Sequence, residues 1–381
     1  MNKAVNTHVR NSSIELLRII AILIIIAHHF CAHGLILSPL KQSSGLMEHI
    51  FSWQVMTVKL LDCEGVRISL FMLITGYFMV HKKVNIKRIL LLLSTMFFYS
   101  WLILLFAKIE FPEMVSKDIV KMNLIPIFYG LDWFVSCYIL FTLFIPFINS
   151  FLTSLSKDRY LSFLLILFTV YAILPVIGMN NFINSNRLMF FFLVYSIGAY
   201  LRLHYQDKIK SIYHKKYRSI LIFALILIFL GKGSLEVMGD ILNRPDFIIS
   251  KTSLYFGEVV GIPLATIMFL TFTTMKMRYN KYINVLAGTV LGVYLIHDND
   301  FFMRRIIWDH IFPNLNYITS DYYLLFWAAK ILGVFIVCSA IDFLRGKYIE
   351  PHIERFIDRH FDSWLGYWNR MVLKVRAVIH I

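Results

Sequence analysis

Apolar stretches of about 20 residues recur along the whole chain and are separated by short basic loops. A helix of that length crosses the hydrocarbon core of a bilayer. Hydrophobic residues make up 58% of the 381-residue chain and charged residues only 16%, which is too little charge to cover the surface of a soluble protein. The sequence therefore predicts an all-α fold: a polytopic integral membrane helical bundle of about ten transmembrane helices.

The charged loops predict how this bundle is oriented. The predicted spans are residues 14–37, 66–81, 89–107, 132–152, 160–177, 187–203, 218–231, 252–274, 282–298 and 322–344. Alternate loops carry about twice as many lysines and arginines as the loops between them, and basic loops stay in the cytoplasm. Both termini are therefore predicted to be cytoplasmic, in a multi-pass protein of the cell (plasma or inner) membrane. Because the net charge of +15 follows these loops rather than one phosphate-binding face, we expect no nucleic acid partner.

The end of the chain has a different composition from the rest. We divide the chain into a ten-span membrane domain, residues 1–345, and an amphipathic cytoplasmic C-terminal tail, residues 346–381. Apolar and aromatic residues recur in the tail at helical spacing, with arginine and lysine between them. This helix could lie on the inner surface in contact with membrane lipid, or it could pack against the bundle. The first apolar segment is too long for a cleaved signal peptide, so we expect it to stay as the first span.

The first span carries ionisable groups that hydrocarbon disfavours, in the stretch RNSSIELLRIIAILIIIAHHFCAHGLIL. Arg18 and His29 are eleven residues apart, so on a helix they lie within about 20° of the same face, with His29 about 16 Å deeper. Arg18 alone could extend to the lipid headgroups, and a lone histidine could bond a neighbouring helix. Because Arg18 and His29 lie on the same face of the helix, together they favour an internal polar cavity.

Other polar residues of the span have simpler interpretations. Ser12 and Glu15 have the spacing of a capping box, which predicts the start of the helix. His33 lies one turn beyond His29 and the pair could bind a metal, but no acidic helix partner accompanies them and we predict no metal. His28 points about 100° away from His29, so we expect it to be a neighbour without a role. The four cysteines are scattered and show neither a disulfide framework nor metal-ligand spacing.

Arg18 and His29, with ten residues between them in ELLRIIAILIIIAHHF, resemble the arginine–ten–histidine signature that opens membrane acyltransferase family 3. Three further segments are similar to that family in the same order: GVRISLFMLITGYFM (65–79), DWFVSCYILFTLFIPFIN (132–149) and LGVYLIHDND (291–300). The resemblance implies an integral membrane O-acyltransferase that moves an acetyl or other acyl group from cytoplasmic acyl-CoA to a hydroxyl of a surface polysaccharide or lipid-linked glycan. We expect acetyl-CoA as donor substrate and no permanently bound cofactor.

The resemblance also implies roles for the first-span residues. A hydroxyl needs a base when it attacks a thioester, and the imidazole of His29 suits that role because its usual pKa is near neutrality. His29 could instead carry the acyl group transiently. Arg18 is predicted to act with it and to bind the phosphates of the donor, because guanidinium forms charge-assisted hydrogen bonds to phosphate.

A basic cluster before the third span could also bind the donor, although the topology alone would require it. Family members often carry an Arg-x-x-Arg pair here, whereas in this chain Arg88 is followed three residues later by Leu91. Lys83 and Lys87 would have to substitute, and lysine is a poorer bidentate ligand for phosphate. We predict donor binding by Lys83, Lys87 and Arg88.

On the outer side, Trp133, His297 and Asp298 are predicted to bind the acceptor, since carboxylates accept from sugar hydroxyls and aromatic rings pack on sugar faces. They could also be ordinary helix-end and headgroup residues. Asp132 is better interpreted as a helix start, and Glu258 is a weaker candidate.

A transporter or flippase of a lipid-linked glycan is the alternative function, because it would also need many spans and buried polar groups. Such proteins are typically built from inverted repeats. No repeat is evident between residues 14–177 and 187–344. A glycan polymerase would need a long external loop, which the spans leave no room for.

Overall fold

The computed structural model describes residues 10–36, 53–62, 64–176, 187–211, 214–242, 257–299 and 301–379. Over these ranges the chain forms helices and no strands, which confirms the all-α class. Within the described residues, seven helices are long and apolar enough to cross a membrane, and two shorter apolar helices accompany them. The chain is therefore a polytopic helical bundle, while the number of ten spans and the cytoplasmic position of the termini stay predictions.

The long helices follow the predicted spans closely. They are α1 (Ser12–Cys31), α4 (Ile86–Glu110), α7 (Trp133–Ser154), α8 (Lys157–Phe168), α11 (Arg187–Ser211), α12 (His214–Ile241) and α18 (Tyr323–Tyr348). Helix α1 continues as a π-helix over Ala32–Ile36, and α8 continues through a π-helix, Thr169–Ile173, into α9 (Leu174–Val176). The shorter helices are α2 (Trp53–Leu61), α3 (Glu64–Met79), α5 (Lys117–Leu124), α6 (Pro126–Tyr129), α14 (Glu258–Thr274), α15 (Lys281–Gly288), α16 (Val290–His297) and α17 (Met303–Arg305). A terminal helix, α19 (Glu350–Ile379), completes the chain.

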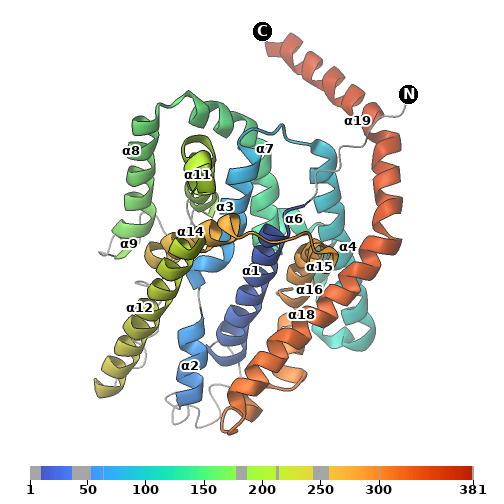
Figure 1. The fold of residues 1–381 in the computed structure, drawn as a ribbon. Coiled ribbons are helices and arrows are strands. Elements are labelled where there is room, and N and C mark those ends of the chain that lie inside the picture. Colours follow the sequence, from blue (N-terminus) through green and yellow to red (C-terminus); the bar gives the residue numbers. More distant parts are fainter. Residues whose placement is uncertain are drawn as a thin grey trace.

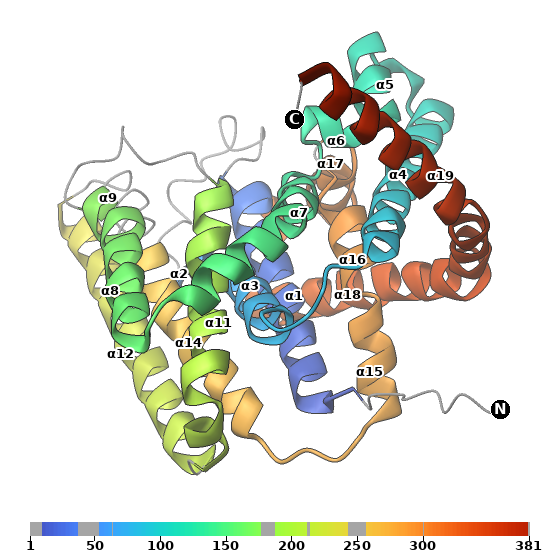
Figure 2. The ribbon, with the colours of Figure 1, turned by 90° about the horizontal axis from the view of Figure 1, so that it is seen from above.

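Helix α1 lies at the centre of the bundle. It contacts α3 and α14 on one side and α15, α16 and α18 on the other, as Figures 1 and 2 show from two directions. Two buried apolar clusters form on these two sides, and α1 contributes Leu17 to one and Ile22 to the other. A helix that is apolar around its whole circumference is buried on all sides. A polar side chain on the buried part of α1 must therefore find its partners inside the protein.

Helices α3 and α11 cross at a pair of glycines. A Cβ atom on Gly76 would lie 2.1 Å from the backbone oxygen of Tyr195, and one on Gly198 would lie 2.3 Å from that of Leu73. Small residues let membrane helices approach closely enough for backbone packing, which replaces the hydrophobic drive that lipid does not supply. The crossing fixes α3 against α11, and α3 in turn packs against α1.

Gly76→Ala is therefore expected to destabilise the bundle by about 1–3 kcal/mol, because the backbone of α11 cannot move away as a side chain could. Gly233→Ala in α12 is the matched control, since nothing lies within 4 Å of its Cβ position. Thermal unfolding in detergent measures both variants. Equal midpoints for the two variants would contradict the role of the crossing.

The start of α1 corrects one prediction. The N-cap residue is Asn11, whose side chain accepts from the backbone N–H of Ser13 at 3.1 Å, so the capping box of Ser12 and Glu15 was wrong. The hydroxyl of Ser12 instead accepts from the backbone N–H of Asn280 at 2.8 Å and lies 3.2 Å from the side-chain oxygen of Asn284. Asparagine caps helices as well as serine does, which frees Ser12 to join α1 to α15.

The predicted ninth span is two helices, α15 and α16, that meet at Thr289. A Cβ atom on Gly292 would lie 2.2 Å from the carboxylate of Asp342 in α18. That carboxylate accepts hydrogen bonds from the hydroxyl of Tyr99 and from Arg345, both at 2.7 Å. Helix α16 is thus held against α4 and α18, which fixes the position of its C-terminal end.

Helix α19 begins against the bundle and then leaves it (Figure 1). Its first half packs on α4 and α18, buries Ile357, and ties Glu350 to Arg345 at 2.7 Å. Trp364, Trp368 and other apolar side chains farther along are exposed. The first half therefore packs against the bundle, and contact of the second half with membrane lipid stays a prediction.

Candidate active site

His29 is buried in the last turn of α1, just before the helix widens into the π-helix. The wider turn brings His33 close, with the two ring centroids 5.1 Å apart. The ring of His297, from the last turn of α16, lies equally near at 5.1 Å. Single π-turns are frequent at functional sites because they re-aim side chains. Three histidines from two helices thus meet inside the protein.

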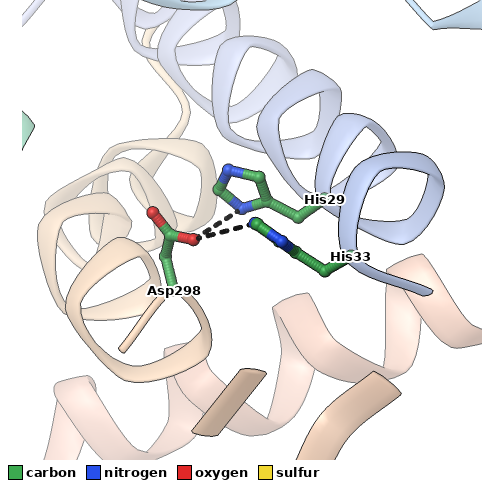
Figure 3. Close-up of side chains that lie close together, drawn as sticks. All are labelled: His29, His33 and Asp298. Atoms are coloured by element: carbon green, nitrogen blue, oxygen red, sulfur yellow. Dashed lines mark ion pairs between the residues drawn. The ribbon is translucent and has the colours of Figure 1, made fainter. Parts of the chain in front are cut away.

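Asp298, directly after α16, joins these groups (Figure 3). Its Oδ1 atom lies 3.3 Å from Nδ1 of His29 and 3.8 Å from Nε2 of His33. The same oxygen accepts a hydrogen bond of 2.9 Å from Nε of Arg304 in α17. Only 3% of the Asp298 side chain is exposed, so its charge is balanced mainly by Arg304 and by the histidines when they are protonated.

Hydrogen bonding fixes which nitrogen of His297 carries a proton. Its Nδ1 atom lies 2.6 Å from the backbone oxygen of Val293, and a carbonyl oxygen can only accept. Nδ1 of His297 therefore carries the hydrogen, and the neutral ring presents a lone pair on Nε2. That Nε2 lies 3.0 Å from Nδ1 of His29.

The same logic assigns the tautomer of His29. Its Nδ1 faces two acceptors, Nε2 of His297 and Oδ1 of Asp298, so it carries the hydrogen. The lone pair of the neutral ring then lies on Nε2, which points away from Asp298 in Figure 3. The residues that the structure describes supply no hydrogen-bond partner to this atom. An oriented imidazole with an uncommitted Nε2 can accept a proton or attack a carbonyl.

The donor set of the cluster bears on whether it could hold a metal. Ligand atoms of His29, His33 and Asp298 lie within 4.8 Å of one another, and two histidines with one carboxylate are a common zinc set. The guanidinium of Arg304, however, already donates to Oδ1 of Asp298, and its positive charge would repel a second cation there. The residues present fit a hydrogen-bonded relay better than a metal centre, and the absence of a metal stays a prediction.

Arg18 lies near the other end of α1, about 16 Å from His29 along the helix. Its NH1 atom lies 3.5 Å from Oε2 of Glu15, and 38% of its side chain is exposed. Glu15 is buried beside it. The structure therefore does not bring Arg18 to His29. It leaves Arg18 accessible at the N-terminal end of the helix whose C-terminal end holds the histidines.

The other predicted donor-binding residues stand apart from the histidines. Lys83 and Arg88 are exposed around the start of α4. Lys87 is engaged by α19, because its ammonium pairs with Asp358 at 2.5 Å and lies 5.0 Å from the ring centroid of Phe361. A donor would have to displace that contact to use Lys87. Binding by these three residues stays a prediction.

Trp133 also lies outside the histidine cluster. The guanidinium of Arg187 lies over its ring at 4.1 Å, and the ring packs against Phe134 and Phe191. Asp132 occupies the N-cap position of α7, as the helix-start interpretation predicts. Its side chain is buried and makes no capping hydrogen bond, so capping does not explain why the residue is an aspartate. Acceptor binding by Trp133 stays a prediction.

The family model for an acyltransferase domain matches residues 11–343, which is most of the chain. The protein belongs to membrane acyltransferase family 3. The match extends from the residue that caps α1 into the last turns of α18, so α1, α16 and the bundle around them all lie within it. Searches of curated proteins and of solved structures found no match.

Membership in membrane acyltransferase family 3 makes the chain a multi-pass membrane acyltransferase. Within it, His297 and Asp298 contact His29 directly, so the acceptor-binding role predicted for them competes with a role in orienting the ring. Spacing along the chain does not predict these contacts, because His29 and His297 are 268 residues apart.

The sequence analysis also did not predict two further contacts. Arg304 pairs with Asp298, and its position six residues later beside Arg305 was the only available signal. His28, which we expected to have no role, lies with Nδ1 at 3.1 Å from both carboxylate oxygens of Asp62. Asp62 follows α2, and nothing in the local sequence predicts its pairing with a residue 34 positions earlier.

Proposed function

We propose that the protein is an O-acyltransferase that moves an acetyl group from cytoplasmic acetyl-CoA to a hydroxyl of a surface polysaccharide or lipid-linked glycan. It would act in the cell (plasma or inner) membrane. The observation that carries the proposal is the buried His29, whose Nδ1 faces His297 and Asp298 while Nε2 is left for chemistry. This arrangement is what a general base in acyl transfer needs.

The steps follow from that geometry. The acceptor oxygen attacks the thioester carbonyl carbon as Nε2 of His29 takes the hydroxyl proton, which gives a tetrahedral intermediate. The carbon–sulfur bond then breaks, and the leaving thiolate takes the proton back from the imidazolium. Asp298, 3.3 Å from Nδ1, stabilises the imidazolium between these steps. If His29 first accepts the acyl group itself, the same Nε2 attacks the thioester carbonyl, the carbon–sulfur bond breaks and the thiolate leaves. The acceptor hydroxyl then attacks the acyl-imidazole, the bond between the acyl carbon and Nε2 breaks, and the hydroxyl proton passes to the thiolate.

The distance between Arg18 and His29 suits a long donor. Acyl-CoA carries its phosphates at one end and its thioester at the other end of an extended pantetheine arm. Arg18 would hold phosphate near the cytoplasmic end of α1, and the arm would bridge the axial distance of about 16 Å to His29. Glu15, beside Arg18, would keep the guanidinium in place before the donor binds.

The proposal is tested with purified protein in liposomes, supplied with radiolabelled acetyl-CoA and a panel of polysaccharide fragments and lipid-linked sugars. We expect label to appear in ester linkage on an acceptor. If no label is transferred but a lipid-linked sugar crosses the membrane, the protein is a flippase and the proposal fails.

Arg18→Ala is expected to raise the KM for acetyl-CoA about 10-fold or more, because it removes a charge-assisted partner of the donor phosphates. The effect on kcat should be smaller, since Arg18 lies far from the reacting atoms. Arg159→Ala, an exposed arginine of α8, is the matched control. An unchanged KM in Arg18→Ala would remove Arg18 from the donor site.

A further inference from the structure

We propose that His28 and Asp62 form the subsite that holds the hydroxyl-bearing acceptor beside His29. The inference rests on the proposed function and adds the place and the chemistry of the acceptor. The ligand class is a polyhydroxylated molecule such as a sugar, held through its hydroxyl groups. This pair lies apart from the contacts between His29, His297 and Asp298 already described.

The first observation is the position of the pair. His28 directly precedes His29 on α1, and the two ring centroids are 5.5 Å apart. The side chains of His28 and Asp62 are 12% and 18% exposed, whereas those of His29 and Asp298 are only 7% and 3% exposed. The pair is therefore adjacent to the buried base and more exposed than His29 and Asp298, as groups that meet an incoming acceptor would be.

The second observation is the hydrogen-bonding capacity of the pair. Nδ1 of His28 lies 3.1 Å from each oxygen of Asp62, so one N–H is shared by the whole carboxylate. A carboxylate has about four lone-pair sites, and this contact leaves sites that can accept from hydroxyl groups. Nε2 of His28 adds a further acceptor in the neutral ring. Such acceptors suit the hydroxyls of a sugar whose neighbouring hydroxyl meets His29.

The third observation is that Asp62 is kept in place and ionised. The ammonium of Lys232, buried in α12, donates to the backbone oxygen of Asp62. Burial alone would raise the pKa of Asp62, but the hydrogen bond from His28 and the charges of Lys232 and Arg67 outweigh it and lower that pKa. A fixed carboxylate loses little entropy when it binds a ligand, which favours recognition.

A structural tie is the competing explanation, because the pair also links α1 to the end of α2 and to α12. The two explanations differ in one measurable quantity. A subsite for the acceptor decides how the acyl group is divided between sugar and water, whereas a tie affects both products alike. The ratio of transfer to hydrolysis therefore separates them.

The experiment uses full-length protein in liposomes with acetyl-CoA and the glycan that wild-type protein acetylates best in the panel above. Asp62→Asn and His28→Gln are each expected to raise the KM for that glycan at least tenfold and to lower the transfer-to-hydrolysis ratio by a similar factor. The KM for acetyl-CoA and the hydrolysis rate without glycan should stay within twofold of wild type. Asp118→Asn, an exposed carboxylate on α5, is the control and should change neither.

The outcomes separate the two proposals. Loss of transfer and hydrolysis in equal proportion, or an unchanged ratio in both variants, overturns the subsite while leaving the acyltransferase proposal intact. Wild-type protein that transfers no acyl group overturns the proposed function, and the subsite falls with it. If Asp62→Asn does not fold, the glycan KM of His28→Gln decides, because that substitution keeps a side chain able to donate to Asp62.

Discussion

His29→Ala is expected to lower acyl transfer to a hydroxyl acceptor by about 10²- to 10⁴-fold, the usual contribution of a positioned general base. The loss should appear in kcat, because His29 acts on the reacting atoms and not on the donor phosphates. The measurement is the rate of ester formation in liposomes at saturating acetyl-CoA. The variant should still bind the donor, and this binding can be measured as protection of the protein against thermal unfolding.

The control for this prediction is His360→Ala, an exposed histidine of α19. It removes the same ring from the same protein without touching the cluster and should leave transfer unchanged. If His29→Ala kept more than a tenth of the wild-type rate, His29 would be neither base nor acyl carrier. An acyl group trapped on His29 after rapid quenching would favour the carrier route. If no acyl group is trapped while acyl transfer runs at the wild-type rate, the general-base route is favoured.

The second large effect is expected when the two groups that face Nδ1 of His29 are replaced. Asp298→Asn and His297→Phe should each slow transfer about 10- to 100-fold, or about 1.4–2.7 kcal/mol, because each leaves the other acceptor to orient the ring. The double variant should approach His29→Ala, because the negative charge and the His297 acceptor are then both gone and an asparagine amide can also donate to Nδ1, which favours the other tautomer. Asparagine has the shape of aspartate, so the first variant tests charge more than packing.

A double-mutant cycle on the transfer rate measures this coupling. Thermal unfolding of each variant in detergent separates loss of activity from loss of fold. A double variant no slower than the worse single variant would show that only one of the two side chains acts on His29.

The sequence by itself determined the class of fold and the family. Hydrocarbon does not hydrogen-bond the backbone, so a segment that spans the membrane in this chain must be a helix of nearly fixed length. In the sequence, such helices are recognised as runs of about 20 apolar residues. Most helix bounds came within a few residues for the same reason, as for α4 and α18. Arg18 and His29 were also found from one helix, because their shared face depends only on spacing along the chain.

Only the tertiary structure decided what surrounds His29. The contacts to His297 and Asp298 join segments 268 or more residues apart, and the pairing of His28 with Asp62 joins α1 to the chain after α2. Each local segment would suit a lipid-facing or an interior position equally well. Burial of α1 between two apolar clusters forces its polar groups to find partners in other helices, and which partners they find depends on how those helices pack.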